Sequence, residues 1–339
     1  MDLTKFKYRK EYHKVILVVV NVVGFKMEKI CFGIDIGGTS VKLGIFTESG
    51  NLMDNWEIPT RKENDGMYIL DDVSKSIQSK LVEYNIEPGS VLGIGIGVPG
   101  PVTEDGTVLQ CVNLGWGIFN VSEKMENLTG FKTKVGNDAN VAALGEMWQG
   151  GGKGNKNMIM VTLGTGVGGG VILDGEIVTG SNGAAGEIGH ILVSHDEVDT
   201  CGCGKHGCLE QFASATGIVK EAKRLLSSSK EPSKLRDMQY LSAKCIFDLA
   251  KEGDDLAIRC VEQLGKYLGV ALSHVAAVVD PQAFVIGGGV SKAGTILTDV
   301  IKKYYDQYVM LALKGKEFKL ATLGNDAGIY GSAKLIIGK

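Results

Sequence analysis

Proline, aromatic residues and unbalanced charge are all scarce in this chain of 339 residues. It contains 6 prolines and 7% aromatic residues, and its 36 basic and 39 acidic side chains leave a net charge of -3. A chain without excess positive charge lacks the electrostatic signature of proteins that bind nucleic acid or anionic membranes. The sequence also shows no repeat of solenoid length and no low-complexity tail. Because the chain has no excess of positive charge, any phosphorylated ligand would have to be held by backbone amides and helix ends.

Cysteine is too sparse and too uneven for a disulfide framework. Of 7 cysteines, three lie close together in the sequence, at Cys201, Cys203 and Cys208, and the other four are scattered among apolar neighbours. We interpret the scattered ones as buried thiols. An odd number of cysteines in a chain of this size favours a reducing compartment, so we expect a cytoplasmic protein.

The first 26 residues contain an apolar run, Val15–Val23, that is too short to span a bilayer. Basic residues precede this run as in a signal peptide, but no small-residue cleavage site follows. We interpret residues 1–26 as a leader or a misassigned start that is dispensable. A packed extension and an export signal remain as alternatives. We expect no membrane attachment.

Glycine is abundant, and its 48 residues fall in clusters between apolar stretches. Apolar stretches of the length typical of strands predict strands at 30–36, 41–46, 52–58, 91–98, 158–163, 169–173 and 283–286. Apolar residues at helical spacing predict helices at 67–84 and 327–337. Within 135–149, we expect a strand to end and a helix to begin. The two similar halves predict an α/β protein with a duplicated fold and a cleft between its two domains. We expect residues 27–136 with 325–339 to form the smaller domain and residues 137–324 the larger one.

The first motif is the strand–turn–strand segment Phe32–Lys42. Asp35 stands at the end of the strand, and Gly37, Gly38 and Thr39 follow in the turn. Such a turn can bring backbone amides against phosphate oxygens while the carboxylate faces Mg²⁺. A tight hairpin with an acidic residue is the alternative.

A second glycine loop, Gly164-Thr165-Gly166, lies between two predicted strands. It begins a G-x-G-x-x-G pattern that also occurs at Gly95–Gly100. A dinucleotide-binding fingerprint must open a helix, whereas these matches lead into a strand and a proline. The sequence also lacks a P-loop and the H-R-D and D-F-G signatures of protein kinases.

The polar group Asn137-Asp138-Ala139-Asn140 opens an amphipathic segment. Asn and Asp are common helix caps, which is the simpler interpretation. The functional interpretation is that Asp138 acts as a general base toward a hydroxyl group.

Residues His190, Cys201, Cys203 and Cys208 have the spacing of a structural zinc site. Three thiolates and one imidazole complete a tetrahedral ligand set and leave no open position for catalysis. Three unligated loop thiols are the alternative. Glu187 and Glu210 flank this segment, and the metal could fix them in place.

In these motifs and their order, the chain resembles the ROK family (repressors, open reading frames and sugar kinases), which has the actin-like, ribonuclease H-like ATPase fold. The resemblance covers nearly all of residues 29–337. The matching segments are DIGGT at 35–39, GVPGPV at 97–102, NDAN at 137–140, LGTGVGGG at 163–170, GEIGH at 186–190, CGCGKHGCLE at 201–210 and GGG at 287–289. Within the family, the likeness is greatest to bacterial glucokinases.

The resemblance implies ATP-dependent phosphorylation of glucose to glucose 6-phosphate, with Asp138 as the general base. It also implies that sugar hydroxyls are bound by Asn137, Asp138, Glu187, His190 and Glu210. Phosphate and Mg²⁺ would be bound by Asp35, Gly37, Gly38, Thr39 and Lys42, and by Gly164, Thr165 and Gly166. The adenosine pocket would be lined by Gly287, Gly288 and Gly289. A structural Zn²⁺ would be held by His190, Cys201, Cys203 and Cys208.

Two alternatives to a glucose kinase remain from the resemblance. The first is a kinase for N-acetylmannosamine, N-acetylglucosamine or fructose, and the second is a sugar-sensing repressor. The segment before Asp35 is too short for the DNA-binding domain of such repressors, and we expect no nucleic-acid partner. The resemblance also implies a homodimer or homotetramer.

Overall fold

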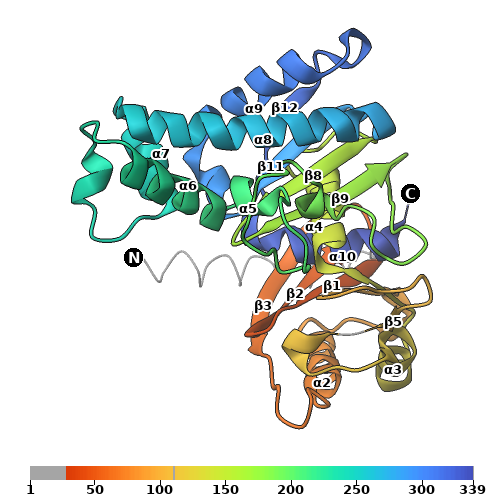
Figure 1. Ribbon diagram of the computed structural model, residues 1–339. Helices are drawn as coiled ribbons and strands as arrows, with labels where there is room; N and C mark the ends of the chain where they lie inside the picture. The colour runs from red at the N-terminus through yellow and green to blue at the C-terminus, as the bar shows by residue number, and fades with distance from the viewer. Residues whose placement is uncertain (1–27, 110, 339) are drawn as a thin grey trace, which may run out of the picture. The chain divides into compact units, whose positions relative to one another are not determined.

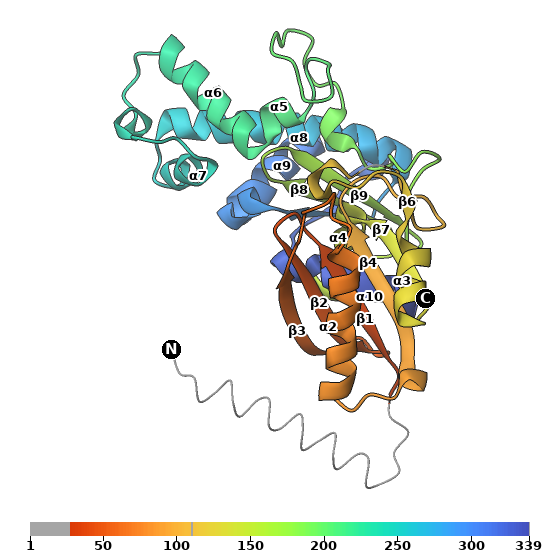
Figure 2. The ribbon, with the colours of Figure 1, turned by 90° about the horizontal axis from the view of Figure 1, so that it is seen from below.

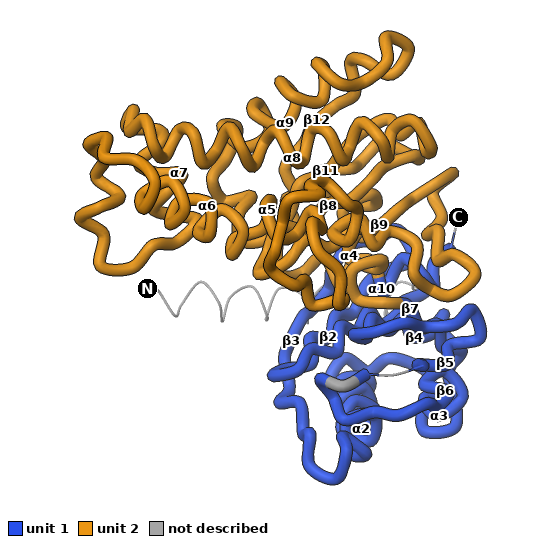
Figure 3. The backbone as a smooth tube through the Cα atoms, viewed as in Figure 1, with its two compact units in different colours: residues 1–136, 332–338 blue, residues 137–331, 339 orange. Residues whose placement is uncertain are grey.

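The computed structural model describes residues 28–109 and 111–338, so the interpretation of residues 1–26 lies outside it. The chain divides into two compact units (Figure 3). The first unit consists of the residues up to Gly136 together with Ser332–Gly338 near the end of the chain. The second unit comprises Asn137–Gly331. No helix within the described ranges combines the length and hydropathy needed to cross a bilayer.

The first unit is built on a five-stranded sheet with the order β3-β2-β1-β4-β7. Its strands are β1 (Ile30–Ile36), β2 (Ser40–Thr47), β3 (Leu52–Pro59), β4 (Val91–Val98) and β7 (Thr133–Asn137). The first three strands form an antiparallel meander, and β4 pairs in parallel with β1. The short strands β5 (Thr107–Val108) and β6 (Phe119–Asn120) pair separately.

Helices cover both faces of this first sheet. The helices α2 (Ile69–Glu83) and α3 (Val121–Thr129) lie on one face (Figure 2). The last part of α10 (Ala327–Ile337) lies on the other face, where the Ser332 hydroxyl donates to the carbonyl of Ile34 at 2.7 Å. Most apolar residues of β1, β2 and β4 are thereby buried.

The second unit repeats this arrangement with the strand order β10-β9-β8-β11-β12. Its strands are β8 (Met158–Leu163), β9 (Val167–Leu173), β10 (Glu176–Ile177), β11 (Ala283–Gly287) and β12 (Glu317–Leu320). Again the first three strands are an antiparallel meander, and the later two pair in parallel. The duplication predicted from the sequence is therefore present.

One helix, α4 (Asp138–Gln149), lies on one face of the second sheet, and a layer of helices covers the other (Figure 1). On that face lie α8 (Asp255–Val279) and α9 (Thr295–Tyr308), and α5 (Glu210–Ala213), α6 (Ala215–Ser228) and α7 (Ala243–Lys251) pack against α8. The apolar side chains of these helices and those of β8 and β11 form one buried core. This core supports the loops at the ends of β8 and β11.

The boundary between the units near the C-terminus lies after Gly331, whereas the sequence placed it after residue 324. The reason is that the start of α10 packs directly on α4. A side chain at Gly331 would overlap the carbonyl of Val141, and one at Gly145 would overlap the carbonyl of Ala327. Because the two helices approach to backbone contact, the first turn of α10 belongs to the second unit.

Candidate active site and metal centre

The start of α4 is fixed by a side-chain cap. Asn137 is the N-cap residue, and its Oδ1 accepts the amides of Ala139 at 3.0 Å and Asn140 at 3.2 Å. Asparagine is among the best residues at this position because its oxygen satisfies amides that have no partner within the helix. The simpler interpretation of this motif, a helix cap, therefore holds for Asn137 and leaves Asp138 available for another role.

Asp138 is the first residue of α4 and is half-buried. Its Oδ1 accepts the amide of Ala139 at 2.8 Å. Burial raises the pKa of Asp138 above its usual range, and the negative charge of Glu187 adds to the increase. Hydrogen bonds from the Ala139 amide and the Asn137 side chain partly offset this shift. A carboxylate with a raised pKa is a better proton acceptor than an ordinary aspartate.

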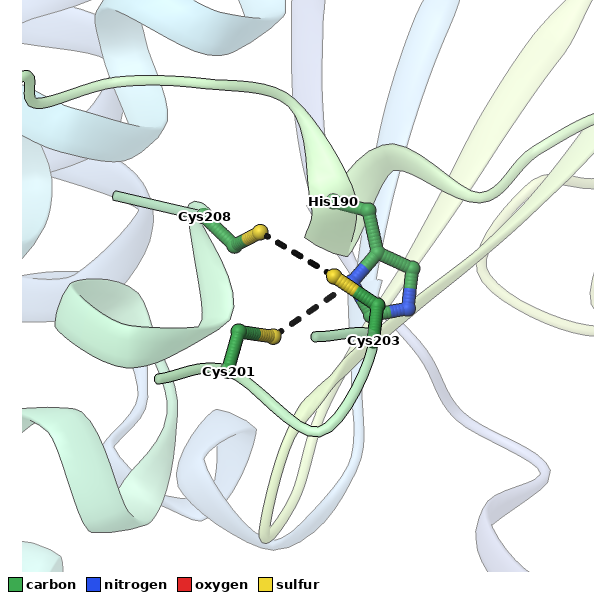
Figure 4. A group of neighbouring side chains, drawn as sticks. All are labelled: His190, Cys201, Cys203 and Cys208. Atoms are coloured by element: carbon green, nitrogen blue, oxygen red, sulfur yellow. Dashed lines mark hydrogen bonds between the residues drawn. The ribbon is translucent and has the colours of Figure 1, made fainter. Parts of the chain in front are cut away.

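The four predicted metal ligands lie together, as Figure 4 shows. The nitrogen and sulfur atoms of His190, Cys201, Cys203 and Cys208 are all within 4.8 Å of one another. The sulfurs of Cys203 and Cys208 are 3.6 Å apart, and the sulfur of Cys201 is 3.7 Å from Nδ1 of His190. A tetrahedral zinc site with Zn–S bonds of about 2.3 Å requires sulfurs about 3.8 Å apart. The cluster therefore fits a four-coordinate zinc ion.

Two carboxylates flank the imidazole of His190. Glu187 lies 3.8 Å from Nε2, and Glu210 lies 3.8 Å from Nδ1. Glu210 also accepts a hydrogen bond from the Cys201 thiol at 2.8 Å. Burial, with this bond, raises the pKa of Cys201 to about 12. The predicted sugar-binding residues of this region are thus held around the metal cluster.

The second glycine loop lies directly against Glu210. The amide of Gly164 donates to the carbonyl of Gly166 at 3.0 Å, which closes a tight turn between β8 and β9. A side chain at Gly166 would collide with Oε2 of Glu210. This contact joins the predicted phosphate loop to the predicted sugar-binding residues, although the two segments are far apart in the sequence.

The GGG segment lies at the end of β11, beside the same loop. Gly288 has a φ of +82°, and a side chain there would collide with the carbonyl of Leu163. A pocket of about 180 Å³ adjoins this segment, and its walls are Ala215, Ala243, Lys244, Phe247, Asp248, Gly289, Val290, Lys292 and Ala293. The sequence had suggested only the glycines of this wall. The contribution of α7 was missed because its residues form an ordinary amphipathic helix.

The first glycine loop belongs to the other unit. Asp35 pairs with Lys42 across β1 and β2, and the amide of Gly37 donates to the carbonyl of Ser40 at 3.0 Å. The Thr60 hydroxyl fixes the turn by donating to the carbonyl of Gly37 at 2.7 Å. Lys42 lies 3.7 Å from Glu57. The turn therefore has the tight geometry that the sequence predicted.

The second unit contains all the other predicted site residues, from Asn137 to Gly289. Within it, Asp138 interacts with Glu187, Glu187 and Glu210 flank His190, and Glu210 contacts the second phosphate loop. Gly288 lies against the strand that leads into that loop. The described part of this unit thus joins a candidate base, a candidate metal site and a predicted phosphate loop.

Residues 31–339 match the sequence model of the ROK family, and the chain belongs to that family. It is 43% identical over 309 residues to a protein from Halalkalibacterium halodurans named glucokinase, covering 90% of this chain and 94% of that protein. It is 34% identical over 319 residues to the glucokinase of Streptomyces coelicolor, covering 90% of this chain and 97% of that protein.

A solved structure supports the same relationship. The ROK family glucokinase from Streptomyces griseus, crystallised with glucose and AMPPNP, superposes with a TM-score of 0.68 at 33% identity. The match covers 90% of this chain and 98% of that chain. The fold is the actin-like ATPase fold of the ROK sugar kinases.

Proposed function

We propose that this protein is a glucokinase, which transfers the terminal phosphoryl group of ATP to the 6-hydroxyl of glucose. The observation that carries the proposal is the position of Asp138 at the start of α4, where burial and Glu187 raise its pKa. The relatives named glucokinase, which align over nearly their whole length, support glucose as the acceptor.

In the proposed reaction, Asp138 accepts the proton of the sugar 6-hydroxyl as that oxygen attacks the terminal phosphorus. The new O–P bond forms while the bond from phosphorus to the bridging oxygen breaks, and ADP leaves with the electron pair of that bond. Phosphoryl transfer depends mainly on positioning and on stabilising negative charge. Asp138 would therefore orient the hydroxyl as well as receive its proton.

Glucose hydroxyls would be bound by Asn137, Asp138, Glu187, His190 and Glu210. Because His190 directs Nδ1 toward Cys201, its Nε2 is the ring nitrogen on the side of Glu187. Zinc, held by His190 and the three cysteines, would supply rigidity to this region and no chemical step.

The donor would be held mainly by backbone amides. Phosphate oxygens would be bound by the second glycine loop and by the first, which contains Gly37, Gly38 and Thr39. The pocket beside Gly289 has a volume suited to an adenine ring. In the first unit, Lys42 and Asp35 would also contribute to donor binding, and Mg²⁺ beside Asp35 would neutralise charge on the phosphates.

A sugar panel tests the proposal directly. ADP release is measured with glucose, N-acetylmannosamine, N-acetylglucosamine and fructose at saturating Mg-ATP. We expect glucose to have the highest kcat/KM, because polar groups held rigidly toward the hydroxyls reject sugars that do not match them. A competitor with an equal or higher kcat/KM would overturn glucose as the substrate, and no ADP release with any sugar would overturn the kinase assignment.

We further propose a cytoplasmic, homo-oligomeric enzyme. A reducing compartment keeps Cys201, Cys203 and Cys208 as thiols that can bind the metal. Size-exclusion chromatography with light scattering tests the assembly, and a mass equal to one chain would contradict it.

A further inference from the structure

Glu197 is a fully buried carboxylate that the proposed reaction does not use. Its Oε1 accepts the amide of Asp199 at 2.9 Å, and the Nη2 of Arg224 donates to its two oxygens at 3.1 and 2.8 Å. The ammonium group of Lys220 lies 3.1 Å from Oε2. Burial alone would raise the pKa of Glu197, but these partners lower it to about 2. Glu197 is therefore charged and is held by two cations.

Both cations belong to α6, whereas Glu197 belongs to the segment 191–208 between His190 and Cys208, which we call the metal loop. Lys220 and Arg224 are four residues apart, so they project from the same side of the helix. Lys220 also pairs with Asp199 of the metal loop. The metal loop is thus bound to the middle of α6 by ion pairs.

The N-terminus of α6 holds the second phosphate loop. The amide of Ala215 donates to the carbonyl of Gly164 at 2.8 Å, and the Thr216 hydroxyl donates to the carbonyl of Thr165 at 2.6 Å. Ser214 caps the helix by accepting the amide of Gly217 at 3.0 Å. One helix therefore contacts the phosphate loop at its start and the metal loop one to two turns later.

The charged pair fixes geometry in a way that an apolar contact would not. Burying a carboxylate has a desolvation cost, and well-packed apolar residues often stabilise a fold equally well. The charged contact in which Nη2 of Arg224 bridges both oxygens of Glu197, in contrast, restricts the distance and the orientation between its two segments. The arrangement is suited to holding α6 in one position relative to the metal loop.

We propose that Glu197 is a positioning residue that acts through α6 to place the second phosphate loop for the phosphoryl donor. This inference rests on the proposed kinase function. The sugar-binding groups Glu187, His190 and Glu210 are held by the metal cluster and its surroundings. Loss of Glu197 therefore affects the donor more than the sugar.

The test compares Glu197→Gln with the wild-type chain. We expect the Kd for Mg-ADP, measured by calorimetry, and the KM for ATP each to increase about tenfold, because the loss of one hydrogen bond to a charged phosphate group has an effect of this size. The KM for glucose and the zinc content should stay within twofold of the wild-type values. A merely structural role would reduce the melting temperature and leave both ligand constants unchanged.

Further variants keep the proposal testable if Glu197→Gln folds poorly. Arg224→Lys retains the charge on a shorter side chain that lacks the guanidinium group, and we expect it to weaken Mg-ADP binding by a smaller factor in the same direction. Glu262→Gln is the matched control, because it removes an ion pair of 2.7 Å with Lys303 between α8 and α9. The proposal is overturned if Glu197→Gln and Arg224→Lys bind Mg-ADP within twofold of wild type. The ADP measurement needs no sugar turnover, so it remains informative if glucose is not the substrate.

Discussion

Replacing Asp138 with asparagine removes a carboxylate while keeping the shape of the side chain. The amide oxygen of the new side chain would still accept the Ala139 amide, which Asp138 accepts at 2.8 Å, so the start of α4 should be retained. We expect Asp138→Asn to lower kcat by about 10²–10⁴-fold, the usual effect of losing a general base. Steady-state kinetics measure the loss, and circular dichroism and glucose binding by calorimetry serve as controls. A variant that keeps more than half of the wild-type kcat would refute the assignment.

The raised pKa of Asp138 predicts a particular pH dependence. A general base must be deprotonated, so kcat/KM for glucose should fall as the pH decreases through the pKa of the free enzyme. Because burial raises that pKa, the fall should begin at a higher pH than for an ordinary aspartate, whose pKa is about 3.9. A profile of kcat/KM against pH measures the acid limb. A limb at or below the ordinary aspartate value would contradict the prediction.

Gly166 tests the contact between the phosphate loop and Glu210. Gly166→Ala places a methyl group where Oε2 of Glu210 lies, so the carboxylate must move away. Since Glu210 is a flexible side chain, we expect the melting temperature to change little while kcat/KM for glucose falls at least tenfold, a loss typical of misplaced catalytic groups. Gly89→Ala is the control, because a methyl group there meets no atom within 4 Å and Gly89 lies outside the proposed site. Equal activity of Gly166→Ala and wild type would show that the Glu210 position is unimportant.

At the level of elements, the longer strands were predicted well, whereas the short strands β5, β6, β10 and β12 were not. The strands β1, β4 and β8 and the helix α10 have the predicted bounds, because long apolar runs and glycine turns define them locally. The helix α3 was missed because only Val121 and Met125 of its 9 residues are buried. The stability of a helix with so few buried apolar residues comes from packing against neighbouring elements, so its own sequence shows little hydrophobic periodicity.

The site shows the same division between local and long-range information. The cluster of His190 and the three cysteines could be predicted, because its members lie close together in the sequence. The burial of Glu197 could not, because an isolated glutamate is usually exposed. Glu146 is a second example. It is fully buried on α4, and its carboxylate accepts the amides of Gly151, Thr322 and Leu323 at 2.8 to 3.0 Å. Only the folded chain brings the last two amides to this helix.

The metal loop should lose its structure when a ligand is removed. Cys203→Ala leaves three ligands, and because metal binding contributes directly to folding, both zinc content and melting temperature should fall. Metal analysis of wild-type protein purified without added zinc should give about one zinc per chain. Cys245→Ala is the control, since Cys245 lies on α7 outside the cluster. Wild-type protein that is fully active without zinc would contradict the prediction.

At the level of the whole molecule, each unit has its own buried core. One core is formed by residues of β1, β2, β4 and α2, and the other by residues of β8, β11 and the helices α6, α8 and α9. Proteins with more than one such unit often unfold in more than one step. The proposed glucose-binding residues, from Asn137 to Glu210, all belong to the second unit. Glucose should therefore stabilise the unfolding step of that unit selectively.

Differential scanning calorimetry measures this selectivity. A ligand at about 100 times its Kd adds about 2.7 kcal/mol of stability, and a unit of this size gains about 2–4 °C for each kcal/mol. We therefore expect saturating glucose to raise one transition by about 5–10 °C and to move the other by less than about 2 °C. Galactose, the 4-epimer, is the control sugar, and it should have little effect at the same concentration because it presents one hydroxyl in the wrong direction. A single transition that glucose moves as a whole would show that the two cores unfold together. A shift confined to the first unit would mean that the glucose-binding residues have been assigned to the wrong half of the chain.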